Sequence, residues 1–349
     1  RDTIADAEDI ARELIPLATG AWDYIKNSGS FNADKWDLEF LGFLPGKRES
    51  RRMTGEYIIT ERDIVKNRIF DDTVAYGGWP LDDHFPDGFY HKGTPNTDIK
   101  TPAPYCIPYR AMYSKNVENL FFAGRNISMT HMAMSSIRVM MTCAIMGQAV
   151  GTAAAVAHRF SLTPHEVYLN KLELLQDTLL DNDCFLPNKK RKVGEICKKT
   201  EIINGNNTLN NGEDRPHRIY GSECGVTVTN STALEYRFDK PEYVTSAHIT
   251  FDSDLNRETL PGDECERYHS MRSNILKNSP QFYVPKTLCK KFILECETER
   301  GTEVILNEEN NLTRAYNAEI NKNVTSIRLT PLTNWGGTDK TAVFSFDFK

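Results

Sequence analysis

The chain has 349 residues, of which 40% are hydrophobic and 26% charged, and its formal net charge is −6. This length exceeds one ordinary hydrophobic core, and the composition is that of a soluble globular protein, so we expect two domains. The negative charge argues against non-specific nucleic-acid binding. The eight cysteines include no C-x-x-C pair. The sequence therefore indicates no zinc ribbon, no iron–sulfur cluster and no other metal site.

Two segments of the first half carry candidate site residues. Paired arginines at 51–52 precede an alternating strand at 56–60, and a strand at 71–77 ends at a pair of glycines before Asp82 and His84. Because Asp82 is two residues from His84 on an extended segment, the two side chains should share a face. The carboxylate could then fix the tautomer of a histidine that accepts a proton. A loop histidine can equally be a surface residue, and both interpretations stay open.

The segment 105–113 leads toward the middle of the chain and is held extended by Pro104 and Pro108. Its Tyr109 and Arg110 are candidate substrate contacts. A guanidinium is planar and always charged, so Arg110 is suited to clamp a carboxylate or another polar group of a substrate. The alternative is that Arg110 satisfies buried carbonyl groups.

A strand, a turn and a long helix follow. The apolar run at 117–123 predicts a buried strand, Gly124 begins a turn, and a helix is expected from about 133 to 160. Gly147 and Gly151 are four residues apart, so another backbone could approach one side of this helix, and we expect that side to lie under a sheet. Such a strand–turn–helix presents unpaired amides and the positive end of a helix dipole, which favours an electron-rich ligand.

A membrane span is the competing interpretation of this helix. Residues 139–157 are nineteen in number and carry no formal charge, close to the roughly 20 that cross a bilayer. The run contains Gln148, glycines, threonines and many alanines, and no aromatic belt flanks it. A buried helix of a soluble protein is therefore favoured, and no membrane span is predicted.

The string at 117–157, VENLFFAGRNISMTHMAMSSIRVMMTCAIMGQAVGTAAAVA, resembles a flavin-contacting segment. It is similar to the C-terminal part of FAD-dependent oxidoreductases with a glutathione-reductase-like nucleotide fold. More narrowly, it resembles a bacterial group of such enzymes, some of which carry the name xanthan lyase. The resemblance implies FAD as cofactor, with contacts from Ala123, Gly124, Arg125 and Asn126.

Two other motifs resemble elements of the same family, AYGGWPLDDH at 75–84 and IPYR at 107–110. The resemblance implies hydride transfer to the flavin from an organic substrate, such as a carbohydrate-derived alcohol or acid. The catalytic candidates are His84, His131 and Arg110, and the substrate-binding candidates in this half are Asp82, Tyr109 and Arg138.

The resemblance also shows what this chain lacks. A FAD-binding fold of this type needs a G-x-G-x-x-G strand–turn–helix for the pyrophosphate, and no such motif occurs among the 349 residues. The chain opens inside an acidic, helix-like run without Met or a signal peptide. We therefore expect a truncated chain, with an incomplete Rossmann-like α/β domain, one wall of the flavin site, and weak or no FAD binding of its own.

The second half changes character. A helix from Thr163, a plausible N-cap, closes a first domain at 1–187. A basic and then Asn/Gly-rich stretch at 188–216 has linker composition. Short alternating strands at 217–349 indicate an all-β domain. They resemble a galactose-binding-like jelly roll, which is a β-sandwich.

Three functions remain open. The first is a flavin-dependent oxidoreductase, and the second is a polysaccharide lyase using Tyr109, Arg110 and His84. The third is a non-catalytic carbohydrate-binding protein acting through the sandwich, where Trp335 is either a platform for a sugar ring or packed under its own turn. The expected partner is a small molecule or a carbohydrate. The cysteines leave the compartment undecided between cytoplasm and periplasm.

Overall fold

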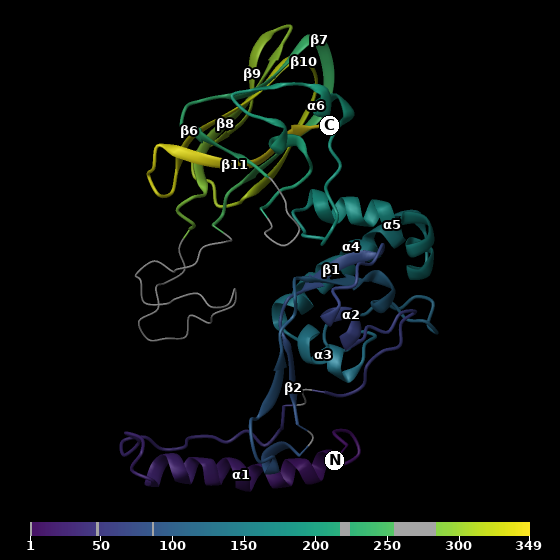
Figure 1. The fold of residues 1–349 in the computed structure, drawn as a ribbon, viewed down its shortest axis with the longest axis vertical. Coiled ribbons are helices and arrows are strands. Elements are labelled where there is room, and N and C mark those ends of the chain that lie inside the picture. The colour runs from purple at the N-terminus through teal and green to yellow at the C-terminus, as the bar shows by residue number, and fades with distance from the viewer. Residues whose placement is uncertain (1, 47–48, 86, 217–223, 255–283) are drawn as a thin grey trace.

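The protein forms two separate hydrophobic cores, one built between Ile59 and Leu186 and one between Val193 and Phe348. Figure 1 shows an elongated molecule, with a β-sandwich at one end, the helices of the first core in the middle and a lone helix at the far end. Two cores agree with the expectation from length, while the limits 1–187, 188–216 and 217–349 stay a prediction. This computed structural model describes residues 2–46, 49–85, 87–216, 224–254 and 284–349.

The first unit combines helices with two short antiparallel ribbons. β1 pairs with β4, and β2 pairs with β3. Helix α4 packs on α5 and on β1, and α3 packs on β2. In chain order the elements are α1 (Ala7–Asn27), α2 (Glu61–Val65), β1 (Thr73–Gly77), β2 (Leu81–His84), η1 (Gly88–Tyr90), β3 (Asn96–Ile99), β4 (Tyr105–Pro108), η2 (Tyr109–Ala111), α3 (His131–Ile137), α4 (Met140–Phe160) and α5 (Pro164–Asp181).

Helix α5 begins where the sequence predicts. The Thr163 hydroxyl accepts from the amide of Glu166, and the Glu166 carboxylate accepts from the amide of Thr163 at 2.8 Å. Pro164 occupies the first helical position, where its missing N–H costs nothing. Val167 and Leu175 on the apolar stripe are fully buried, so this helix closes the first core.

The long helix expected from 133 to 160 is two helices. They meet at Arg138 and Val139, where the backbone of Val139 is extended. The Arg138 guanidinium donates to the carbonyl oxygen of Asp82 at 2.9 Å, which holds the end of α3 against β2. The end of the first helix thus coincides with a contact between distant segments.

The small-residue side of α4 faces outward. Met146 and Ala153 lie in the first core, while a Cβ placed at Gly147 or Gly151 would meet no other atom of the described chain within 4 Å. The sheet expected on this side is therefore not seen among the described residues. By length and composition α4 could cross a membrane, but a core helix of a soluble protein passes the same test, and α4 has a buried side.

Two of the expected strands are not strands. The segments 56–60 and 117–123 contribute only isolated bridges, such as that between Phe121 and Tyr113. Val117 is half-exposed, whereas Phe122 packs into the first core. The apolar run at 117–123 is therefore not a strand. Some of its side chains pack into the first core from irregular backbone.

The second unit is a β-sandwich in which two long strands run through both sheets. The first half of β10 pairs with the second half of β7, and its second half pairs with β8 and with the start of β7. β11 and β6 extend one sheet, and β9 and β5 extend the other. The elements are α6 (Glu195–Lys199), β5 (Ile202–Ile203), η3 (Asn207–Asn210), β6 (Val226–Thr229), β7 (Leu234–Phe251), β8 (Cys289–Thr298), β9 (Gly301–Glu308), β10 (Ala315–Asn334) and β11 (Lys340–Phe348).

Aromatic side chains from both sheets fill the space between them. The rings of Phe251 and Phe292 are 4.9 Å apart, and the Tyr236 hydroxyl donates to the carbonyl of Phe346 at 2.6 Å. The two alternating runs expected on either side of Pro241 are one strand, β7, whose pairing with β10 is interrupted between 237 and 242. Since proline cannot donate to a ladder, the strand bends there and passes between the sheets.

Of the expectations for the second half, the structure confirms one and differs from another. The hairpin predicted around 299–301 is confirmed, with Thr298 opposite Gly301 across β8 and β9. The stretch 188–216, expected as a linker, contains α6, β5 and η3, and its Cys197 and Leu209 are buried in the second core. We propose that the sandwich unit begins within this stretch.

Candidate active site

A cavity of about 280 Å³ lies where α1, β2 and α3 meet. Its α1 wall is apolar, while the opposite wall carries titratable groups, the mixture typical of ligand pockets. Three of the predicted site residues, His84, His131 and Arg138, line it together. The other lining residues are Thr3, Ala7, Ile10, Leu14, Pro45, Gly46, Glu49, Asp83 and Met134.

His131, the first residue of α3, is held between two carboxylates. Its Nδ1 lies 2.5 Å from Glu49 Oε2, and its Nε2 lies 2.8 Å from Asp83 Oδ1. Ionised carboxylates only accept hydrogen bonds, so the ring donates both only when it carries two N–H groups. Glu49 also pairs with Arg52 and accepts at its carbonyl from the Thr3 hydroxyl. His131 thus ties three segments together.

His84, the last residue of β2, lies beside Asp82. Its side chain is 43% exposed, and its Nε2 lies 3.8 Å from Asp82 Oδ1, an ion-pair distance rather than a hydrogen-bond distance. Asp82 accepts from Asn96 Nδ2 at 2.5 Å across the β2–β3 ribbon, and its carbonyl accepts from Arg138. These contacts fix Asp82, so the carboxylate beside His84 has a defined position.

Arg110 does not line this cavity. Its Nε and Nη2 donate to the two carboxylate oxygens of Asp72 at 2.9 and 3.0 Å, and Asp72 is fully buried. The hydrogen bonds that the guanidinium donates to Asp72 raise the pKa of Arg110, while burial opposes them. The guanidinium also lies over the rings of Tyr57 and Tyr168. Its partner in the structure is therefore a buried carboxylate rather than the carbonyl groups that the sequence left as the alternative.

Tyr109 is likewise absent from the cavity and has no exposed surface. Its hydroxyl donates to the carbonyl of Pro164 at 2.9 Å, and burial raises the pKa of the phenol. A lyase would need Tyr109, Arg110 and His84 at one site. Their placement gives that interpretation no support.

Residues 123–126 form a tight turn at the surface of the first unit. Gly124 has φ +100°, a conformation that favours glycine, and its carbonyl accepts from the amide of Ile127 at 3.3 Å. The carbonyl of Asn126 accepts from the amide of Met53. Arg125 is exposed, and Ala123 and Gly124 are partly exposed, so a ligand could reach them.

The start of α4 lacks a side-chain cap. Its N-cap is Val139, and the first two helical residues, Met140 and Met141, are 84% and 56% exposed. Burial raises the pKa of the Cys143 thiol in this first turn, and the charge of Arg125 opposes the shift. Free amides, a helix dipole and a cation together suit an electron-rich group. The helix that directly follows the 123–126 turn is α3, whose N-terminus is capped by the Thr130 hydroxyl, so α4 is the helix start left open to an electron-rich group.

Trp335 lies in the sandwich, where it contacts neighbouring segments of the chain. Its Nε1 donates to the carbonyl of Asn311 at 2.8 Å, its amide donates to Leu288, and the side chain packs against the second core. The Lys290 ammonium lies 4.6 Å from its ring centre. Its ring is therefore engaged within the sandwich rather than presented as an open platform.

Sequence reasoning missed Glu49 and Asp83. The sequence gave a hint for Asp83, because this residue stands between the predicted site residues Asp82 and His84. On a strand, however, its side chain should point away from both of them. No sequence pattern pointed to Glu49, since its contact with His131 joins residues that are 82 positions apart. Across the described part of the chain, no cluster of three or more His, Cys, Asp or Glu side chains could hold a metal ion.

The structure thus combines an α/β unit that contains a cavity with a β-sandwich. Residues 3–179, about half of the chain, match the family model described as FAD dependent oxidoreductase, and the chain belongs to this family. No curated protein matches the chain.

Several solved structures show local likeness. The family 32 carbohydrate-binding module from Streptococcus pneumoniae EndoD is 12% identical with TM-score 0.27, covering 41% of this chain and 83% of the module. A family 32 module produced by Clostridium perfringens, in complex with glcNAc-alpha-1,4-galactose, is 14% identical with TM-score 0.27, covering 46% and 96%. A two-domain protein of unknown function from Bacteroides fragilis is 12% identical with TM-score 0.29, covering 46% and 45%.

Proposed function

We propose that the first unit serves hydride transfer from an organic substrate to FAD, with the substrate in the cavity between α1, β2 and α3. Family membership supplies the cofactor class. One observation carries the proposal. Helix α3 joins the two candidate sites, because Arg138 lines the cavity and the next residue, Val139, occupies the N-cap position of α4.

FAD would be held by residues 123–126 and by the first turn of α4, and when bound it supplies the acceptor for the hydride. The chain's own residues do the remaining work. The apolar side chains of Ile10 and Leu14 exclude water from one side of the cavity and favour a substrate with an apolar part. Arg138 keeps a positive charge at the cavity wall, where it favours a developing oxyanion.

His84 is the proposed proton acceptor. Its ring lines the cavity, and the nearby Asp82 carboxylate favours the ring once it has gained a proton. His131 has a different task in this proposal, because both of its ring nitrogens are engaged by carboxylates. It positions Glu49 and Asp83, and so the walls on which His84 depends.

The test uses full-length protein reconstituted with FAD and mixed without oxygen with a panel of alcohols and sugar acids. The His84→Asn variant should bind flavin as the wild type does. It should reduce the flavin about a hundredfold more slowly, the lower end of what a general base contributes, and lose the pH dependence of the step. His158→Asn, a change in the last turn of α4, is the control.

Two outcomes contradict the proposal. A protein that stays colourless after careful reconstitution has no flavin function. Equal reduction rates for the His84→Asn and His158→Asn variants would remove His84 from the mechanism.

A further inference from the structure

An apolar groove of about 510 Å³ lies next to the candidate active site, between α1 and residues 41–46. Figure 1 shows α1 at the end of the molecule that is farthest from the sandwich, with the β2 ribbon reaching toward it. Every side chain that lines the groove is apolar, including Ile15 and Leu17 of α1 and Leu41 and Phe43 of the facing segment. These side chains can therefore offer a ligand only apolar contacts.

The side chains of this groove are accessible to a ligand. Leu14 and Ile15 are each 42% exposed, and Leu44 is 82% exposed. None of the three belongs to either hydrophobic core of the described chain, and α1 has no buried residue. Exposed apolar surface of this kind on a soluble protein commonly marks a binding site.

The groove continues into the cavity of the candidate active site. Leu14, Pro45 and Gly46 line both of them. Together the cavity and the groove follow α1 from Ala7 to Ala18, a distance of about 16 Å at the rise of an α-helix. A single elongated ligand can therefore occupy both.

The cavity end of this path is polar and carries charges of both signs. Glu49 and Asp83 supply carboxylates, Arg138 supplies a guanidinium, and two histidines stand beside them. A hydroxyl group can donate to a carboxylate and can accept from a guanidinium, whereas a charged head group would also meet a like charge. The cavity therefore suits an uncharged head group that both donates and accepts.

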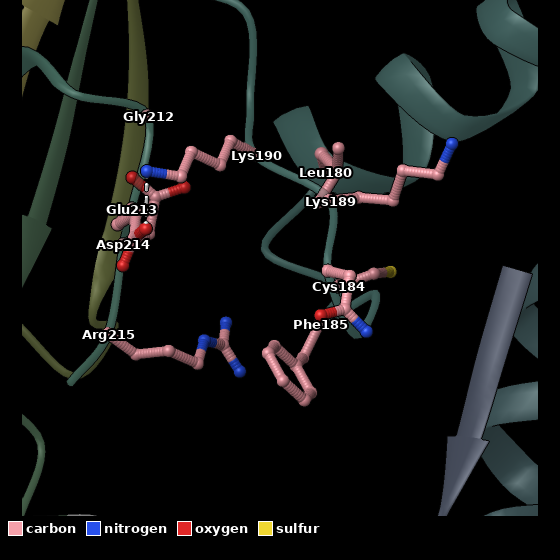
Figure 2. A pocket seen from close by; sticks show the side chains of 10 residues that line it. Leu180, Cys184, Phe185, Lys189, Lys190, Gly212, Glu213, Asp214 and Arg215 are labelled. Atoms are coloured by element: carbon pink, nitrogen blue, oxygen red, sulfur yellow. Dashed lines mark ion pairs between the residues drawn. The ribbon is translucent and has the colours of Figure 1, made fainter. Parts of the chain in front are cut away.

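The cavity of about 240 Å³ between the two units differs from this groove in its charge. It lies between the end of α5 and residues 212–215, and Figure 2 shows charged side chains on both walls, with Lys190 turned to Glu213. Lys190 Nζ lies 2.6 Å from a Glu213 oxygen, and Arg215 pairs with Asp183. Because a hydrocarbon chain would take these charges out of water, the groove along α1 is the better place for it.

We propose that the cavity and the groove together bind a primary alcohol with a linear hydrocarbon chain, its hydroxyl end in the cavity and its chain along α1. That this alcohol is the substrate rests on the proposed function. In that reaction the alcohol gives up a C–H hydrogen as hydride and its O–H hydrogen as a proton, and it leaves as an aldehyde. The cavity alone, about 280 Å³, is smaller than the roughly 300–1,000 Å³ of common ligand pockets, and the groove supplies further room.

The binding test uses the full chain without FAD and a series of primary alcohols, butanol, hexanol and octanol, in titration calorimetry. Full burial of a methylene group is worth about fourfold in affinity, so a groove that is open on one side should give about twofold for each added methylene. Octanoate and octylamine should bind more weakly than octanol, because each brings a charge into the cavity. Glucose, which has hydroxyl groups but no hydrocarbon chain, should bind more weakly than octanol.

Ile15→Lys tests the groove, and Ile25→Lys is its matched control. Both isoleucines belong to α1 and have exposed side chains, but Ile25 lines neither the groove nor the cavity. Ile15→Lys should weaken octanol binding about tenfold, because it removes apolar contacts along the chain, and should leave butanol binding unchanged. Ile25→Lys should bind both alcohols as the wild type does, and circular dichroism verifies that both variants are folded.

Four results would overturn the inference. They are affinities that do not rise with chain length, tighter binding of octanoate, octylamine or glucose than of octanol, equal effects of the two lysine variants, and a dimer in sedimentation that octanol does not dissociate and Ile15→Lys does. The last result would assign the groove to a second copy of the chain.

Flavin reduction separates this inference from the proposed function. If the FAD-loaded protein oxidises sugar acids while the binding series shows no effect of chain length, the proposed function stands and the inference falls. If octanol binds as expected but never reduces the flavin, the proposed function falls and the groove keeps its ligand.

Discussion

His131 carries a testable signature at the scale of a single ring. Both ring nitrogens lie within hydrogen-bond distance of a carboxylate, so both should show N–H character in ¹⁵N spectra if both donate. The Asp83→Ala variant should remove the hydrogen bond at Nε2 and shift that nitrogen. Asp87→Ala, which changes an exposed carboxylate near another histidine, should leave the His131 signals unchanged. A wild-type ring with a single N–H would contradict this geometry.

Asp63 illustrates a pH-dependent contribution to stability. Burial raises the pKa of this carboxyl, but hydrogen bonds from Thr60, Tyr57 and Arg68 outweigh burial and hold the pKa below the ordinary value of 3.8. Since the folded pKa is the lower one, the stabilisation is present above pH 3.8 and is lost as the pH falls through the folded pKa. Asp63→Asn should lower the free energy of unfolding by about 1–2 kcal/mol at neutral pH.

Urea denaturation at neutral and at acid pH checks this expectation. The gap between wild type and Asp63→Asn should narrow in acid, because both side chains are then uncharged. A gap of constant size would mean that the carboxylate charge contributes nothing.

Residues close in the chain were predictable, and their distant partners were not. The two-residue spacing of Asp82 and His84 on a strand was enough to make them neighbours. Arg110 has its partner Asp72 at a separation of 38 residues, created by the pairing of β1 with β4. No local pattern in the sequence encodes such a pairing.

At the scale of elements, α4 offers a clean test. Gly151 is helical, and an added Cβ would meet nothing within 4 Å. Gly151→Ala should therefore raise the free energy of unfolding by about 0.5–1 kcal/mol through helix propensity alone. Gly55→Ala is the contrasting change, because its Cβ would lie 2.6 Å from the carbonyl oxygen of Arg110 and should destabilise the protein. Thermal unfolding of both variants measures the difference, and a loss of stability in Gly151→Ala would contradict it.

Elements whose ends depend on neighbouring residues were predicted correctly from the sequence. Elements that depend on packing between distant residues were not. The cap at Thr163 is a local signal, and α5 starts there. The break after α3 depends on Arg138 reaching Asp82, and the segment 117–123 buries apolar side chains without a strand partner. Periodicity could not anticipate either outcome, because each depends on contacts made only in the folded chain.

At the scale of the molecule, the two units are joined by polar contacts at the end of α5. Asp183 pairs with Arg215 and, at 2.5 Å, with Arg314, and Asp181 pairs with Lys349 at 2.6 Å. Cations at a helix C-terminus also oppose its negative dipole end. Linker composition predicted a loop here but could not predict that it is fixed, because Arg314 and Asp183 are 131 residues apart.

Asp183→Ala should loosen this junction. Arg314 is only 13% exposed, so removing its carboxylate leaves a largely buried cation and should cost about 2 kcal/mol, between the values for exposed and buried pairs. The two cores should then unfold in separate thermal transitions, and small-angle scattering should give a larger radius of gyration. Asp239→Ala, a change at an exposed aspartate within β7, should keep the wild-type behaviour. An Asp183→Ala protein with unchanged radius and one transition would show that apolar packing, not these ion pairs, holds the two units together.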